Sequence, residues 1–217
     1  MKFDYPIPSA QDLYTLLKPF GGKKPIAREV YERTALAYSS EGRFYHTLAH
    51  VGQVLGVAKF LSESGDCHFG SDSHLALLFA AWFHDVVYDP RRDDNEAQSV
   101  VWMKKALRPF GIPVLILEET VNLILATRNH IASPDHLSTQ ILLDADLSIL
   151  GAPPEIYRQY AVAIRQEYNF VSDNAYRSGR RAVLERFLAR PQIFHHPITF
   201  AALEKQARGN MMEEIHT

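Results

Sequence analysis

Apolar residues recur along this chain at spacings of three and four, and no segment alternates with period two over more than a few residues. The first spacing is typical of amphipathic helices and the second of strands. The pattern predicts helices over 9–20, 25–41, 46–64, 75–83, 95–109, 113–129, 139–150, 154–168, 172–190 and 199–214. We therefore expect an all-α fold of roughly nine to ten helices, with the last one fraying towards its polar end. Repeats, low-complexity tracts and linkers are absent from the sequence, which favours a single domain over 1–217.

The apolar run 75–83 is the most unusual of these segments, because it ends directly in His84 and Asp85. A helix without a polar face would carry both side chains into the interior. A buried, unpaired carboxylate costs several kcal/mol, roughly, so Asp85 needs a partner. Either a divalent cation shared with His84 or a structural His–Asp hydrogen bond would meet this need.

Two further segments carry polar residues on faces that should be buried. His46 and His50 are spaced i, i+4 and would lie on one side of the helix 46–64. Asp146 has only apolar neighbours one turn away, namely Leu142, Leu143, Ile149 and Leu150. Asp146 is therefore expected to point into the core, whereas Asp144 is expected to be a second-shell or surface group.

Composition narrows the classes of partner. A net charge of −2 with mixed signs excludes generic nucleic-acid binding, and the run 75–83 is about half the length that spans a bilayer. The single cysteine, Cys67, lies in an expected polar loop over 65–73 and cannot form an internal disulfide, and the first residues lack the apolar core of a signal peptide. We expect a cytoplasmic protein without membrane contact that binds small molecules or proteins, with a homo-oligomer left open.

Histidine and carboxylate ligands from separate helices suit a borderline or hard divalent ion, such as Mn, Fe, Co, Ni, Zn or Mg. His50, the pair His84 and Asp85, and Asp146 would supply four ligands and leave coordination positions open for water. Open positions are typical of catalytic sites, and a water activated by a metal ion can attack phosphorus.

The order His, His-Asp, Asp on a helical chain, with the segments FHDVVYDPRRDDNEAQS and LLDADLSILG, resembles the HD superfamily of metal-dependent phosphohydrolases. The similarity covers roughly 43–180 and is greatest to a bacterial branch of predicted HD phosphohydrolases. It implies that His50, His84, Asp85 and Asp146 bind one divalent metal ion. It also supplies the step that adjacent residues share an ion, since neighbours on an ideal helix diverge by about 100°. The implied function is hydrolysis of a phosphomonoester or phosphodiester, with a nucleotide as the expected substrate.

The resemblance also implies a proton donor. Tyr45-His46 before the ligand His50 is similar to the arrangement in cyclic-nucleotide phosphodiesterases, where the earlier histidine protonates the leaving oxygen. His46 and Asp85 are therefore the expected catalytic residues. Val87 and Tyr88 replace the glycine and lysine that follow the His-Asp pair in many signalling members, which argues against a signalling nucleotide.

Other polar residues near these motifs could either belong to the site or have an ordinary structural or surface role. For a second metal ion or a second shell the candidates are Asp89, Glu96, His130 and Asp144, although acids around Asp93 and Asp94 also suit a helix cap. For the phosphate the candidates are Arg128, Arg165, Arg177 and Arg180, each of which could equally be a surface arginine.

Three alternatives to the phosphohydrolase stay open from the sequence. A helical His/Asp site with two irons could activate oxygen instead. The chain could also be a non-catalytic module that binds a metal or a nucleotide, or a helical scaffold without metal. Each would use the same buried polar residues, so spacing alone does not separate them.

Overall fold

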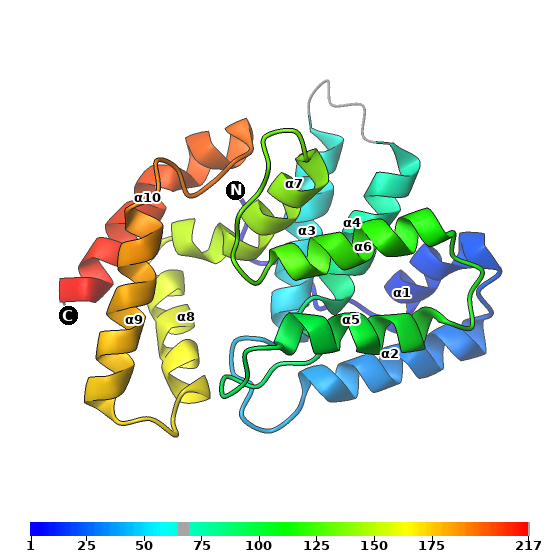
Figure 1. The fold of residues 1–217 in the computed structure, drawn as a ribbon, viewed down its shortest axis with the longest axis horizontal. Helices are drawn as coiled ribbons and strands as arrows, with labels where there is room; N and C mark the ends of the chain where they lie inside the picture. The colour runs from blue at the N-terminus through cyan, green and yellow to red at the C-terminus, as the bar shows by residue number, and fades with distance from the viewer. Residues whose placement is uncertain (65–69, 217) are drawn as a thin grey trace.

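The chain folds into helices joined by short loops, as the computed structural model shows for residues 1–64 and 70–216 (Figure 1). No strand occurs within these ranges, so the prediction of an all-α fold is confirmed. The expected loop residues Cys67 and His68 lie outside the described residues. Within the described ranges, no helix is both long and apolar enough to cross a bilayer.

The first half of the chain contains helices α1 to α5, with one short 3₁₀ helix. Ser9 begins α1 with a capping box shared with Asp12, as its position before the first apolar stripe predicts. The elements are α1 Ala10–Leu17, η1 Lys18–Phe20, α2 Lys24–Tyr38, α3 Leu48–Glu63, α4 Ser71–Phe83 and α5 Asn95–Leu107.

The second half contains α6 to α10 and a second 3₁₀ helix. Ser172 caps α9 by accepting from the Ala175 N–H, which confirms the predicted start of that helix. The elements are α6 Val114–Ala126, α7 Leu137–Asp146, η2 Leu147–Gly151, α8 Pro154–Glu167, α9 Asp173–Leu188 and α10 Pro197–His216.

Several predicted helix boundaries are wrong: the helices expected over 25–41 and 113–129 end at Tyr38 and Ala126, and α4 begins at Ser71 instead of at 75. Three further differences concern the site and the last helix. Thr47 caps α3, so His46 lies in the turn before that helix and not one turn along it. The helix expected over 139–150 ends at Asp146 and continues as the 3₁₀ helix η2. Helix α10 does not fray before His216, because Met211 is buried and Glu214 forms an ion pair with Arg180.

Two clusters of apolar side chains form the interior. The larger one joins α1 to α7, and its centre is α4, where every residue over 76–83 is buried. The smaller one joins η2, α8, α9 and α10, which lie together on one side of the molecule (Figure 1). The larger cluster ends at Ala145 and the smaller begins at Leu147. Asp146 therefore sits where the two clusters meet.

Polar contacts fix the two clusters to each other close to this point. Asp144 is fully buried and accepts hydrogen bonds from the N–H groups of His195 and His196 and from the Thr199 hydroxyl. It is neither a surface group nor one of the four metal-site side chains, because its carboxylate ties α7 to the start of α10. At Gly151 an added Cβ would lie 2.5 Å from the Leu203 Cβ, so only glycine allows η2 and α10 to approach this closely.

Candidate metal centre and the cavity above it

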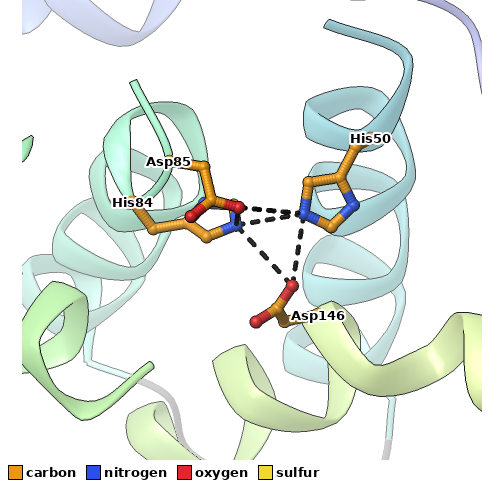
Figure 2. A group of neighbouring side chains, drawn as sticks. All are labelled: His50, His84, Asp85 and Asp146. Carbon is orange, nitrogen blue, oxygen red and sulfur yellow. Dashed lines mark hydrogen bonds and ion pairs between the residues drawn. The ribbon is translucent and has the colours of Figure 1, made fainter. Parts of the chain in front are cut away.

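Four side chains from three helices point towards one centre (Figure 2). His50 lies in the first turn of α3, and Asp146 is the last residue of α7. His84 is the C-cap of α4, and Asp85 already lies in the turn beyond it. Because the helix ends between Phe83 and Asp85, the adjacent side chains His84 and Asp85 can face the same point.

The donor atoms of these side chains all lie within 4.8 Å of one another. His50 Nε2 is 3.1 Å from His84 Nε2, 3.2 Å from Asp146 Oδ1 and 3.5 Å from Asp85 Oδ2. His84 Nε2 is 3.2 Å from Asp85 Oδ2 and 3.7 Å from Asp146 Oδ1. Ligands bound at about 2.0–2.2 Å to one ion lie roughly 3.0–3.5 Å apart, so this group of side chains could hold a metal ion.

The tautomer of His84 also fits a metal ligand. Its Nδ1 lies 3.2 Å from the Ala81 carbonyl oxygen, which can only accept, so Nδ1 carries the proton. In the neutral ring the Nε2 lone pair then faces the centre, as in many metal-binding histidines. The Nδ1 atom of His50 is buried without a hydrogen-bond partner among the described residues, so His50 has no comparable anchor.

The charges of the group favour a cation. Burial opposes ionisation of Asp85 and Asp146, yet the neighbouring histidines outweigh burial and hold the pKa of both carboxyl groups well below the usual range. Burial likewise opposes protonation of His84, but Asp85 and Asp146 raise the pKa of its imidazole well above the usual value. Two carboxylates at this depth thus attract positive charge, whether a proton or a metal ion.

His46 lies beside the group and is held by Glu167, a residue to which the sequence assigned no role. Glu167 Oε1 accepts hydrogen bonds from the N–H groups of Phe44, Tyr45 and His46 at 2.8–2.9 Å. Its Oε2 lies 2.7 Å from His46 Nδ1. The other ring nitrogen, Nε2, is 4.0 Å from Asp85 Oδ2. Glu167 therefore fixes the ring so that Nε2 faces the four donor atoms.

Burial acts to raise the pKa of Glu167, but the hydrogen bonds from His46 and the 44–46 backbone overcome it and lower the pKa to about 2. The carboxylate is thus charged at neutral pH. Since a carboxylate can only accept, His46 Nδ1 carries a proton and donates it to Glu167, which fixes the orientation of the ring.

His130 is a second histidine that contacts the group of four side chains, in this case through Asp146. Its Nε2 lies 2.8 Å from Asp146 Oδ2, the oxygen that faces away from His50 and His84. The backbone of His130 is left-handed, with a φ of 50°, which is rare for residues other than glycine. Arg190 donates hydrogen bonds to the carbonyl oxygens of both Asn129 and His130 and so holds this conformation.

Of the three remaining candidates for a second metal ion, Glu96 lines the same cavity as His130. Asp89 does not line it, since its carboxylate accepts from the Arg91 N–H within its own turn. Asp144 is used in the structural contacts described above.

The predicted phosphate-binding arginines also separate. Arg128 and Arg180 line the cavity. Arg180 already donates to Glu214 and to the Tyr160 hydroxyl. Arg165 and Arg177 do not line it; Arg165 bonds to Asp173 and to loop carbonyls.

The cavity has a volume of about 550 Å³ and opens above the metal-site group. Its polar end contains Asp85, Asp146, His46 and His130, and its other end is formed by α8 and α9. A volume in this range is typical of sites for small molecules.

Sequence reasoning missed three residues that position this site: Glu167, Arg43 and Arg190. Glu167 follows Tyr160 and Ile164 at helical spacing, so a carboxylate in an apolar stripe was the available signal. Arg43 donates to the carbonyl oxygens of His46, Asp85 and Val86 and thereby joins two segments of the site. No spacing in the sequence indicated either arginine.

No protein-family model matches the chain, and no curated protein matches it.

Proposed function

We propose that this protein is a divalent-metal-dependent phosphohydrolase of the HD type, which acts on a phosphomonoester or phosphodiester. The observation that carries the proposal is the pairing of His46 with Glu167 beside the four donor atoms at the base of the cavity. A metal group alone could be structural. An oriented histidine that faces both the group and a cavity is what acid catalysis adds.

His50, His84, Asp85 and Asp146 would hold the ion, whose identity among Mn, Fe, Co, Ni, Zn and Mg is open. A divalent ion bound there would acidify water and offset the negative charge of the phosphoryl oxygens. The protein's own groups account for the proton transfers. The attacking water forms a bond to phosphorus and gives its proton to the Asp85 carboxylate. The ester P–O bond breaks, and the leaving oxygen takes the proton from His46 Nε2.

Arg128 is the cavity cation best placed to contact a phosphoryl oxygen, because Arg180 is already paired with Glu214. Arginine suits this role through its fork of N–H donors. A substrate phosphate would then lie between Arg128 and the carboxylate pair, with the ester oxygen towards His46.

The test is elemental analysis of untagged protein purified without chelator, together with a panel of phosphoesters supplied with the metal that is found. We expect about one metal ion or more per chain, and loss of both metal and hydrolysis in Asp85→Ala and Asp146→Ala. Asp93→Ala is the matched control, since Asp93 is exposed and lies outside the cavity. His46→Asn should keep the metal and lose hydrolysis.

Other outcomes would favour the alternatives. An iron pair with inert phosphoesters would favour oxygen activation and refute the proposal. Binding of nucleotides without turnover across several metals would favour a non-catalytic module. No metal in any sample, and none after dialysis against manganese, cobalt or nickel, would make the His84–Asp85 pair structural.

A further inference from the structure

Helix α9 turns part of its inward face to the smaller apolar cluster and part to the cavity. Leu184 is the one buried residue that its helix contributes. Tyr176, Arg180, Val183 and Phe187, spaced three or four residues apart, all line the cavity. Apolar residues at this spacing normally pack a helix against the hydrophobic core. Here the stripe is left to face an open volume, which indicates that something else covers it.

Much of the cavity lining, called the aromatic wall below, consists of the rings of Tyr45, Tyr160, Tyr168, Tyr176 and Phe187. Tyr160 packs against Tyr45 with ring centroids 4.7 Å apart, and Tyr168 packs against Tyr176 at 6.1 Å. Phe187 closes one end of the same wall. Flat apolar rings of this kind favour another ring, since stacked or edge-to-face pairs are stabilised beyond their buried area.

Two hydroxyl groups in the wall lack partners. The hydroxyls of Tyr45 and Tyr176 are buried, and neither has a hydrogen-bond partner among the described residues. Since both hydroxyl oxygens are shielded from the open volume, these residues present their rings to the cavity and not their polar atoms.

The charge of the cavity limits how many phosphates it can hold. Asp85, Asp146 and Glu96 contribute carboxylates, whereas the lining cations are Arg128 and Arg180. Arg180 is neutralised by Glu214, so Arg128 alone is left to pair with an anion. A divalent ion would offset Asp85 and Asp146, and Glu96 then offsets Arg128, so no surplus of positive charge is left to hold several phosphates.

Gly179 leaves room in the α9 wall. An added Cβ at Gly179 would meet nothing within 4 Å, so the space beside it is open. A glycine inside a helix costs about 1 kcal/mol relative to alanine. Gly209 in α10 is a matched position, because it is also helical and also has open space, but it does not line the cavity.

Resting on the proposed function, we infer that the cavity binds the ring-bearing organic group of a singly phosphorylated compound, with Gly179 providing space for that group. The aromatic wall would receive the ring, and the single phosphate would lie between Arg128 and the candidate metal site. Polyphosphates and small aliphatic phosphates are excluded as preferred ligands, the first by charge and the second by the unfilled wall.

The test measures binding without turnover. Benzylphosphonate and methylphosphonate carry the same anion and cannot be hydrolysed at their P–C bond. With the protein saturated in manganese, calorimetric titration should show benzylphosphonate binding roughly ten-fold or more tightly than methylphosphonate. In Gly179→Leu this advantage should be lost, while the affinity for methylphosphonate stays within about two-fold. Gly209→Leu should behave as the wild type, and circular dichroism should show unchanged helicity in both variants.

Equal affinity of the wild type for the two phosphonates would overturn the inference, and so would an advantage that survives Gly179→Leu in folded protein. A hydrolysis arm separates this failure from that of the proposed function. Benzyl phosphate and ethyl phosphate have leaving groups of similar basicity, so turnover of benzyl phosphate above ethyl phosphate and above a nucleoside triphosphate supports both proposals. Turnover without any ring preference keeps the phosphohydrolase and overturns the ring pocket. A ring preference in binding with no hydrolysis of any ester keeps the pocket and refutes the phosphohydrolase.

Discussion

Replacing Glu167 by glutamine tests whether the carboxylate positions His46 for proton transfer. In the wild type, Glu167 Oε1 accepts from three backbone N–H groups, and Oε2 accepts from His46 Nδ1. Glutamine can keep its oxygen on the backbone donors. Its amide N–H₂ would then face His46 Nδ1, which must accept instead of donate. The doubly protonated imidazolium cannot form that contact, so the acid form of His46 loses its stabilisation.

The expected change in kcat is a loss of roughly 10²-fold or more, which is the usual contribution of a positioned acid. Metal content and KM should change little, because Glu167 is not one of the four donor side chains and does not itself line the cavity. Glu204→Gln is the matched control. Glu204 is a buried carboxylate that accepts from the Ile193 and Phe194 N–H groups, far from the cavity.

The same variant has a stability consequence with a definite sign. The pKa of Glu167 is lowered from 4.5 to about 2 in the folded chain, which corresponds to roughly 3 kcal/mol or less. A lowered pKa contributes stability that is present above pH 4.5 and is lost as the pH falls towards 2. The difference in unfolding free energy between wild type and Glu167→Gln, measured in urea, should therefore shrink over this range. Full activity in Glu167→Gln beside inactive His46→Asn would refute the positioning role.

Three further changes have expected outcomes. Asp144→Ala should lower the unfolding free energy by about 3 kcal/mol or more, read from urea titration, because three buried donors lose their acceptor. Arg190→Ala should weaken metal binding roughly ten-fold by calorimetry, since His130 is released from Asp146, whereas exposed Arg186→Ala should not. Removing a bound metal with chelator should lower the melting temperature of the wild type by several degrees and leave Asp146→Ala unchanged.

The helical fold was predictable because each helix carries its own signals. Ser9 and Ser172 cap the helices that they were expected to cap, and the run 76–83 is buried throughout. Boundaries failed where a local hydrogen bond outweighed the apolar pattern. The Thr47 hydroxyl accepts from the Ala49 N–H, so α3 begins after His46. His46 and His50 are still in contact, but the turn before α3 brings them together and not the spacing within a helix.

Burial of a charge in an apolar stripe was the signal that found Asp146, and it would have found Glu167 as well. It failed for Asp144, whose helical neighbours Gln140 and Ser148 suggested a polar face. The acceptor for three donors of the 195–199 segment cannot be recognised from α7 alone. The roles of Arg43 and Arg190 could not be predicted for the same reason, because each donates hydrogen bonds to carbonyl oxygens of a segment distant in the sequence.

Helices α8 and α9 both line the cavity and carry, at or just beyond their ends, the residues that hold His46 and His130. Glu167, at the end of α8, holds His46, and Arg190, just beyond α9, holds His130. The same two helices supply most of the aromatic wall. A ligand that shifts this wall would therefore also shift both histidines relative to Asp85 and Asp146. Under the proposed function, a ligand that fills the wall would also position the proton donor, so we expect poor occupants of the wall to be poor substrates in kcat as well as in KM.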